Sequence, residues 1–493
     1  MKTKLCLAAI AASALQTPAF AQDFDAVFEE IERAETAPAE PVAERIANEY
    51  VRRILQLDDA GPEINAVIAL NPDAARQARD AEAAGRPLAG RTVLVKDNIE
   101  TRELPTTAGS LALKDNFTGR DAPLIAKLRE AGGVVLGKAN LSEWANIRDF
   151  QSTSGWSAIG GLTRNPHAID RNTCGSSSGS GAGVAARFAW AAIGTETDGS
   201  ITCPASINGI VGFKPSVGMV SRTHVVPISH TQDTAGPMTQ SVGDAAMLLN
   251  AIAGTDPADP ATADAAQHIT DFTDGLGEAS LEGVRIGVLR NQVGSHQGVT
   301  ALFEQALADL RNAGAVLVDI EFTPSEAMGE AEFAVLLYEL REDMATYLAS
   351  LPGSGGPRSL ADLIAFNEVN AEREMRWFGQ DIFEMAEGAT SREEYEAAKA
   401  SAKRMAGEEG IDRLLFENRV EFLIAPTTGP AWSTDLVNGD NYSGGIGAGN
   451  LAAIAGYPHL TVPMGATETL PVGLSFMSRK WADHEVLKVG AAY

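Results

Sequence analysis

The sequence is short of positive charge, of cysteine and of long apolar segments. It has 39 basic residues against 65 acidic ones, which gives a formal charge of −26 at neutral pH. This imbalance argues against nucleic acid and anionic membrane surfaces as partners, and it favours a neutral or cationic substrate. Beyond the N-terminal region, no stretch is long and apolar enough to cross a bilayer. We therefore expect a protein that binds neither nucleic acid nor a membrane.

The patterns of the common metal and nucleotide sites are missing as well. The seven histidines show no metal-binding spacing such as H-E-x-x-H. Residues 132–139 approach a phosphate-binding P-loop, but no Ser or Thr follows the lysine, and strand residues occupy the loop positions. Residues 181–186 match a dinucleotide fingerprint only in part, because polar residues stand where a strand should precede it. We therefore expect no metal and no cofactor.

The first residues have the pattern of an export signal. Two lysines precede a short apolar core from Leu5 to Leu15, and Ala19-Phe20-Ala21 fits the small-x-small cleavage rule. The core is too short to span a bilayer, and Cys6 stands too early for a lipoprotein anchor. We predict a signal peptide at residues 1–21. The remainder, with a charge of −28, should be soluble and exported, and periplasmic if the source is Gram-negative.

Two cysteines remain after that segment, Cys174 and Cys203. In an oxidising compartment these two side chains could form a disulfide bond. The sequence leaves both states open. Of the two, we expect a pair of free, buried thiols.

The most informative stretch is Cys174-Gly-Ser-Ser-Ser-Gly-Ser-Gly-Ala-Gly183, followed by Gly194-Thr-Glu-Thr-Asp-Gly-Ser200. Ser200 stands 24 residues after Ser176, and the apolar interval 184–193 is typical of a short buried helix that runs into a strand. Glycine and serine at a helix start leave backbone N–H groups free to face a ligand. A flexible linker has a similar composition, but both flanks here are apolar. The pattern predicts two serine-bearing turns that meet at one end of a buried layer.

These paired turns resemble those of the amidase signature family, whose common form is a Gly-Gly-Ser-Ser-Gly-Gly-Ser run followed by Asp-Thr-Gly-Gly-Ser-Ile. Its members are hydrolases with a Ser–cis-Ser–Lys triad. By position, the resemblance makes Ser200 the nucleophile, Ser176 the bridging cis-serine and Lys96 the third member. Ser177 would support them. The resemblance also implies an oxyanion hole built from the backbone N–H groups of Thr197, Asp198, Gly199 and Ser200.

A lysine can act as a base only in its neutral form. The short β-branched strand at residues 91–95 would carry Lys96 inward, where burial disfavours the ammonium and lowers its pKa. Ser176 would then relay a proton between Lys96 and Ser200. A lone lysine at a strand end is usually a solvated surface residue, so this interpretation depends on the presence of the two serine turns.

The chain departs from the common family pattern at two positions. Asp198 replaces the usual glycine, but the oxyanion hole uses backbone donors, so we expect it to remain. Thr202 stands where many relatives have an arginine, which in some of them grips a substrate carboxylate. The sequence therefore disfavours substrates with a free carboxylate close to the scissile amide.

The segment 196–205 and the run His230-Thr-Gln-Asp-Thr-Ala-Gly-Pro237 are similar to the exported bacterial peptide amidases of this family. Those enzymes release ammonia from peptides with an amidated C-terminus. An alternative is a general amidase or aryl-acylamidase that acts on small aliphatic or aromatic amides. Thr202 and the acidity disfavour an amidotransferase component, and the intact triad disfavours an inactive binding protein. His167 has no catalytic counterpart in the family.

The resemblance extends over nearly all of the chain after the signal. It implies an α/β fold, a layered α/β/α arrangement with a central mixed β-sheet, in one amidase signature domain over residues 22–493. The β-α-β alternation of residues 284–320 agrees with such a sheet. Residues 326–406 are mostly charged helix and could form a wall of the substrate cleft. Several apolar residues there are more typical of core than of a cleft: Phe333, Leu337, Tyr338, Trp377 and Phe378. The sequence identifies no substrate-binding residue.

Overall fold

The computed structural model describes residues 41–353, 355–388, 391–442 and 445–493. The predicted signal peptide at residues 1–21 lies outside this part of the chain. Within it, no helix is both long enough and apolar enough to cross a bilayer.

An eleven-stranded sheet runs through the molecule, in the order β1-β3-β2-β6-β8-β7-β12-β13-β11-β9-β10. Strands β3, β2 and β6 are parallel to one another, as are β10, β9 and β11, whereas the remaining pairs are antiparallel. The predicted mixed sheet is therefore confirmed. Its strands are β1 Val67–Leu70, β2 Thr92–Lys96, β3 Val134–Ala139, β6 Ala191–Glu196, β7 Val211–Lys214, β8 Thr234–Thr239, β9 Arg285–Leu289, β10 Val316–Ile320, β11 Phe422–Pro426, β12 His459–Thr467 and β13 Leu470–Met477. A separate hairpin pairs β4 Trp156–Ser157 with β5 Gly161–Leu162.

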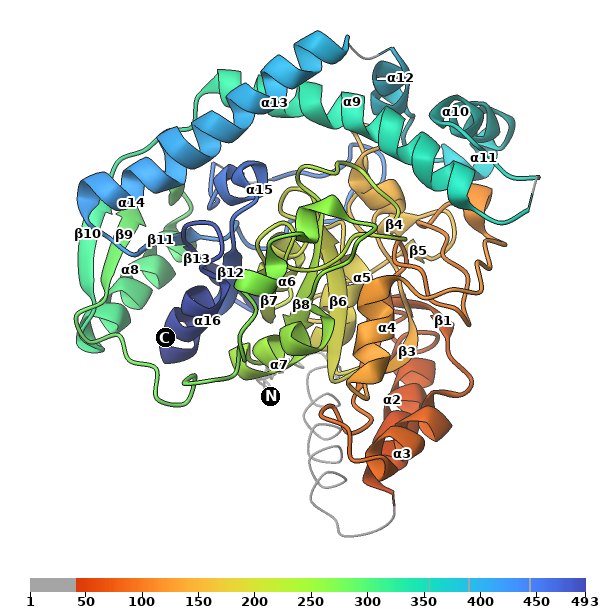
Figure 1. Ribbon diagram of the computed structural model, residues 1–493, viewed down its shortest axis with the longest axis horizontal. Coiled ribbons are helices and arrows are strands. Elements are labelled where there is room, and N and C mark those ends of the chain that lie inside the picture. Colours follow the sequence, from red (N-terminus) through yellow and green to blue (C-terminus); the bar gives the residue numbers. More distant parts are fainter. Residues whose placement is uncertain (1–40, 354, 389–390, 443–444) are drawn as a thin grey trace, which may run out of the picture.

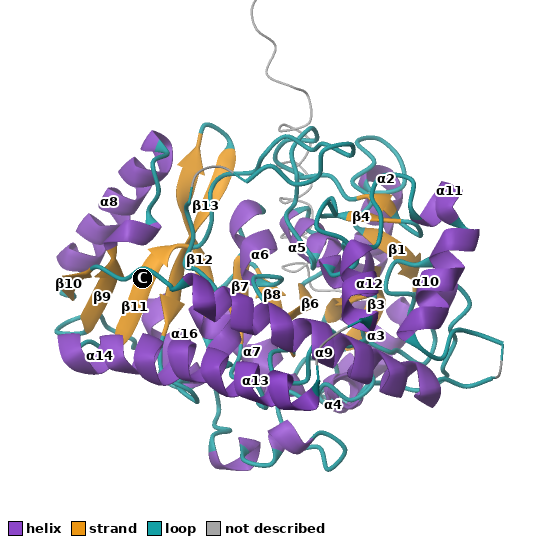
Figure 2. Cartoon of the chain, turned by 90° about the horizontal axis from the view of Figure 1, so that it is seen from above, coloured by secondary structure: helices purple, strands orange, loops and turns teal. Residues whose placement is uncertain are grey.

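Helices cover both faces of this sheet (Figures 1 and 2). They are α2 Val42–Leu57, α3 Ala74–Ala83, α4 Pro123–Glu130, α5 Ser178–Ala185, α6 Thr202–Ile207, α7 Val242–Ile252, α8 Gln297–Asn312, α9 Glu326–Ser350, α10 Leu360–Val369, α11 Ala371–Glu374, α12 Asp381–Glu387, α13 Arg392–Ala406, α14 Arg413–Asn418, α15 Leu451–Ala455 and α16 Asp483–Ala492. The expected α/β/α layering is thus observed.

Successive side chains of the central strands point to opposite faces of the sheet and therefore enter two separate hydrophobic cores. In β2, Val93 and Val95 belong to the core under α4, α7, α8 and α16, whereas Leu94 belongs to the core under α2, α3 and α5. In β6, Ile193 belongs to the first of these cores and Ala192 to the second. Strands that are buried on both faces are largely apolar, as the central residues Val93, Leu94 and Val95 of β2 are.

The helix predicted before β6 lies earlier than its apolar residues suggest. Helix α5 occupies the Gly/Ser run itself and ends at Ala185, and a turn separates it from β6. The small residues let α5 approach the sheet closely. A Cβ atom on Gly179 would stand 2.3 Å from the carbonyl oxygen of Ala66 and 2.6 Å from the backbone of Asn140.

The charged region predicted at residues 326–406 forms a helical arm. Helices α9 and α13 pack against each other and run across the end of the sheet (Figures 1 and 2). Leu340 and Met344 of α9 enter an apolar cluster with Trp144 and Phe383. The arm is therefore packed onto the body of the protein and contributes part of its core.

Replacing Gly179 by alanine should lower the free energy of unfolding by about 1–3 kcal/mol, because the added methyl group meets backbone atoms that cannot rotate away. Urea unfolding would measure the loss. Gly277→Ala is the matched control, since its Cβ would have nothing within 4 Å, and it should change stability by about 0.5 kcal/mol at most. Equal midpoints for the two variants would contradict the close packing of α5.

Candidate active site

Lys96 is the last residue of β2, and its side chain is fully buried. Its Nζ atom donates to Ser176 Oγ at 2.7 Å, to Thr195 Oγ1 at 2.8 Å and to the Thr195 carbonyl at 3.2 Å. Thr195 comes from β6, the parallel neighbour of β2. The sheet thus delivers the lysine to the first of the two serine turns, as the sequence predicted.

Burial lowers the pKa of Lys96 to about 7, because the ammonium loses its hydration. The negative charges of Asp233 and Glu196 oppose this effect but do not reverse it. A large fraction of Lys96 is therefore neutral near neutral pH and able to accept a proton.

Ser176 follows a cis peptide bond at Gly175 and is fully buried. Its carbonyl accepts from the N–H of Ser142 at 3.0 Å. A side chain at Gly175 would collide with Ser142, since an added Cβ would stand 2.1 Å from its Oγ. The packing of this turn requires glycine immediately before the serine.

Ser177 joins the two serine turns. Its N–H donates to the carbonyl of Ser200 at 3.2 Å, and its Oγ donates to the Thr195 carbonyl at 3.0 Å. The N–H of Thr195 in turn lies 3.2 Å from Ser177 Oγ. These bonds tie the first serine turn both to β6 and to Ser200.

The second turn connects β6 to α6 and carries Ser200. The Glu196 carboxylate accepts from the N–H groups of Ile201 and Thr202, at 2.8 and 3.0 Å. Gly199 has a positive φ of 73°, a conformation that glycine adopts readily. Ser200 is 8% exposed, so the side chain at the predicted nucleophile position borders open space.

That space is a pocket of about 270 Å³ bordered by both turns. Lys96 and Ser176 lie buried behind its wall, whereas Ser200 lines it. The lining residues come from the segment after β3, the two turns, the loop before β8, helix α9 and the C-terminal region: Ala145, Asn146, Ile147, Cys174, Gly175, Thr197, Asp198, Gly199, Ser200, Cys203, Ile228, Leu336 and Tyr442. The five apolar residues suggested for the α9–α12 region are absent from this lining. Phe378 is buried, whereas Phe333, Leu337, Tyr338 and Trp377 are half-buried, so the core position expected for them holds for Phe378 alone.

The loop before β8, which lines the pocket with Ile228, also supports the nucleophile turn. Asp233 accepts from Thr197 Oγ1 at 2.6 Å and from the N–H groups of Ile228 and Ser229, at 2.8 and 2.9 Å. Gln232 Nε2 lies 3.4 Å from the Thr197 carbonyl. This loop carries part of the family resemblance, but the sequence indicated no structural role for it.

Asp198 is the one charged side chain in the pocket lining of the described residues. Although it is exposed to the pocket, the surrounding walls desolvate it, and the facing carboxylate of Glu332 adds repulsion; both raise the pKa of Asp198 well above its ordinary value. Glu332 belongs to α9 and accepts from Gln232 and Asn450, each at 2.9 Å. No sequence pattern pointed to this partner, which lies 134 residues away.

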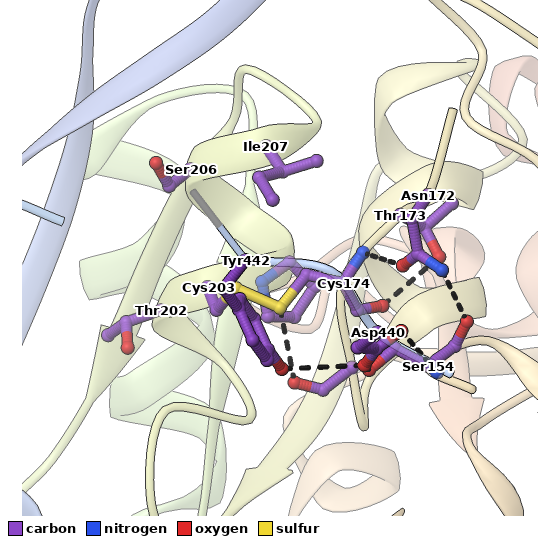
Figure 3. Close-up of a disulfide and its surroundings, with 12 residues drawn as sticks. Ser154, Asn172, Thr173, Cys174, Thr202, Cys203, Ser206, Ile207, Asp440 and Tyr442 are labelled. Carbon is purple, nitrogen blue, oxygen red and sulfur yellow. Dashed lines mark hydrogen bonds between the residues drawn. A yellow bond between two sulfur atoms is a disulfide. The ribbon is translucent and has the colours of Figure 1, made fainter. Parts of the chain in front are cut away.

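The two cysteines are bonded, so the expectation of free thiols is wrong. Figure 3 shows the disulfide between Cys174 and Cys203, whose Cα atoms are 6.0 Å apart. Cys174 immediately precedes Gly175 and Ser176, and Cys203 lies in the first turn of α6 after Ser200. The fold brings the two serine turns together, and this proximity, which residue counting could not supply, makes the bond possible.

His167, one of two histidines near the site, has a structural partner. His167 lies 2.9 Å from the carbonyl of Asn208, burial lowers its pKa, and it does not line the pocket. This position agrees with the non-catalytic role expected for it.

A second group, His230, Glu339 and Asp343, could by its geometry hold a cation. Its polar atoms already have protein partners. His230 Nδ1 lies 2.9 Å from Asp343, and Glu339 accepts from the hydroxyls of Ser229 and Thr231 at 2.5 and 3.0 Å. We interpret the group as a link between α9 and the loop before β8.

Removing both cysteines, by Cys174→Ala with Cys203→Ala, should lower the free energy of unfolding by about 3 kcal/mol, because the bond restricts the unfolded chain. Thiol titration in denaturant offers a direct check. Protein that lacks residues 1–21 and was purified from an oxidising compartment should show no free thiol before reduction and two after it. Two reactive thiols before reduction would contradict the bond.

Comparison with known proteins agrees with this geometry. The family model described as Amidase matches residues 45–487. A probable amidase from Arabidopsis thaliana is 37% identical over 463 residues, which cover 90% of this chain and 85% of the relative. A glutamyl-tRNA(Gln) amidotransferase component from Symbiobacterium thermophilum is 34% identical over 471 residues, covering 92% and 93%.

Among solved structures, native peptide amidase from Stenotrophomonas maltophilia superimposes with a TM-score of 0.86 at 47% identity, covering 92% of this chain and 93% of that one. A peptide amidase bound to the competitive inhibitor chymostatin gives 0.88 and 48%, with the same coverage. The resemblance stated from the two serine turns is confirmed, and this chain belongs to the amidase family.

Proposed function

We propose that this protein hydrolyses the C-terminal carboxamide of peptides to the free acid and ammonia. The observation that carries the proposal is the buried hydrogen bond of 2.7 Å between Lys96 Nζ and Ser176 Oγ, directly behind the pocket that Ser200 lines. The similarity to peptide amidases at 47–48% identity supports the substrate class. The amidase family as a whole supports the reaction type.

The proposed chemistry is acyl transfer to water. Ser200 Oγ attacks the amide carbon, and its proton passes through Ser176 to the neutral amine of Lys96. The same path returns a proton to the leaving nitrogen, so ammonia departs and an acyl-serine remains. Water then attacks this ester, activated by the same base, and releases the acid.

Backbone N–H groups would stabilise the negative oxygen that forms in both steps. The proposed donors lie in the turn Thr197–Ser200, whose shape is held by Glu196 and Asp233 through the hydrogen bonds described above. Donors fixed in advance need no reorganisation during the reaction. The side chain at position 198 leaves these backbone groups in place.

The pocket supports an uncharged group at the scissile bond. Thr202, where many relatives have a carboxylate-gripping arginine, is held by Glu196 and does not line the pocket. No basic residue of the described chain lines it either. These features favour a carboxamide over a substrate with a neighbouring carboxylate, and they disfavour the amidotransferase reaction. The export signal at residues 1–21 and a single catalytic domain over residues 22–493 remain part of this proposal.

The reaction should be tested by ammonia release from an N-acetylated dipeptide amide, beside a small aliphatic amide and an anilide. Wild type should release ammonia from the peptide amide, and Ser200→Ala should reduce kcat by about 10⁴-fold or more, because the nucleophile is lost. The exposed Ser280→Ala is the matched serine control and should keep full activity.

If only the small amide or the anilide is turned over, the triad assignment is kept and the proposal that peptide amides are the substrates is refuted. If no substrate is turned over, labelling by a phosphonate probe would decide whether Ser200 is reactive at all.

The acidic side of the pH profile should report Lys96. Its pKa is lowered to about 7, and the base must be neutral, so kcat/KM should fall about tenfold per pH unit below that value and level off above it. Initial rates between pH 5 and 9 measure this. Lys96→Arg, which stays protonated, should be inactive across the range. A flat profile down to pH 5 would contradict the assignment of Lys96 as base.

A further inference from the structure

We propose that Asp198 and Glu332 form a carboxyl pair that makes the nucleophile pocket accept an uncharged carboxamide and exclude a carboxylate, including the acid that hydrolysis produces. This inference rests on the proposed function, because it concerns the substrate and product of that reaction. It assigns a role to the position at which the chain departs from the glycine of its family's common pattern.

The placement of the two carboxyl groups carries the inference. Asp198 stands two residues before Ser200 on the same turn, and its side chain is exposed to the pocket that Ser200 lines. Glu332 approaches from α9, is only 6% exposed, and lies close enough to Asp198 for its charge to raise the pKa of that carboxyl. The pair therefore connects the wall of the pocket to the helical arm.

The charge of the pair follows from its hydrogen bonds. Burial raises the pKa of Glu332, but Gln232 and Asn450 both donate to it, at 2.9 Å each, and these donors favour its ionised form. Two neighbouring carboxyl groups with little water around them repel each other when both are ionised, so one of them holds a proton. Asp198 and Glu332 together thus keep one negative charge beside the pocket, whichever oxygen carries the proton.

No cation in the pocket lining of the described chain offsets this charge. The remaining lining side chains are apolar or neutral, such as Ile147, Ile228, Leu336 and Tyr442. In a confined space with little water, a like charge is repelled strongly, whereas a neutral amide is not. Hydrolysis converts a neutral group into an anion at this point, so the pair should weaken binding of the product relative to the substrate.

Binding should be measured by calorimetry in the Ser200→Ala background, in which the amide is not consumed. The ligands are N-acetyl-leucinamide and its acid, N-acetyl-leucine. Adding Asp198→Asn together with Glu332→Gln removes the charge of the pair, and it should tighten binding of the acid about tenfold and change binding of the amide less than about threefold. Asp198→Asn alone leaves the Glu332 carboxylate ionised and should change binding of the acid less. Unchanged amide affinity also shows that the pocket of the variant is intact.

Two further variants serve as controls in the same background. Asp170→Asn removes an identical charge from a side chain that is 77% exposed and outside the pocket, and it should leave both affinities unchanged. Asp198→Glu keeps the charge and should retain the exclusion of the acid. Unchanged acid affinity in the variant that carries both Asp198→Asn and Glu332→Gln would overturn the proposal, as would an equal effect of Asp170→Asn.

Failure of the proposed function would be visible separately. If wild type releases no ammonia from N-acetyl-leucinamide but hydrolyses another neutral amide, the binding pair becomes that amide and its acid. The proposal on Asp198 and Glu332 is then tested only by the ratio of the protein's affinities for that acid and that amide. If neither member of any pair binds the Ser200→Ala protein, the proposal is refuted.

Discussion

The burial of the Lys96 amine without a contacting anion is the constraint on which the rest of the site depends. In the described part of the chain, its hydrogen bonds go to neutral oxygens of Ser176 and Thr195. The adjacent strand provides a contrast, because the equally buried Lys138 lies 3.2 Å from the Asp97 carboxylate. Burial lowers the pKa of Lys138 too, but the carboxylate of Asp97 opposes that effect directly, whereas the atoms that contact Lys96 are neutral. The fold thus maintains a basic nitrogen at a cost in desolvation that a purely structural lysine would avoid.

The Lys96 amine can act as a base only if the two serine turns keep their positions relative to it. Several independent contacts fix these positions. Ser177 bonds to both β6 and Ser200, Gly175 allows the cis-serine turn to sit against Ser142, and the disulfide joins the two turns covalently. The loop before β8 then fixes Thr197 through Asp233. Removing any one of these contacts leaves the others in place, which is how a preorganised site resists small motions.

The parts of this site that the sequence predicts are those encoded by short runs of residues. Lys96 follows an apolar strand, Ser176 and Ser200 lie in turns with distinctive spacing, and each could be placed from the order of residues alone. The pairing of Cys174 with Cys203 could not, because it depends on a Cα separation set by how the two turns meet. Glu332 was hidden for the same reason: a glutamate on a charged helix looks like a surface residue until the helix is packed. The order of strands in the sheet, with β8 between β6 and β7, likewise rests on contacts distant in the chain.

Three acidic residues surround the nucleophile turn, and their hydrogen-bond partners differ. These partners indicate which of the three hold the backbone and which can select the substrate. Glu196 receives two backbone N–H groups of α6, and Asp233 receives two from its own loop together with the Thr197 hydroxyl. Both carboxylates therefore hold the backbone of the site in place. The Asp198 carboxyl faces the carboxyl group of Glu332, and its side chain is exposed to the pocket rather than tied to the turn. A glycine would form the same turn without this charge, so the aspartate contributes nothing that the backbone geometry requires. Its charge is therefore available to act on whatever enters the pocket, as proposed above.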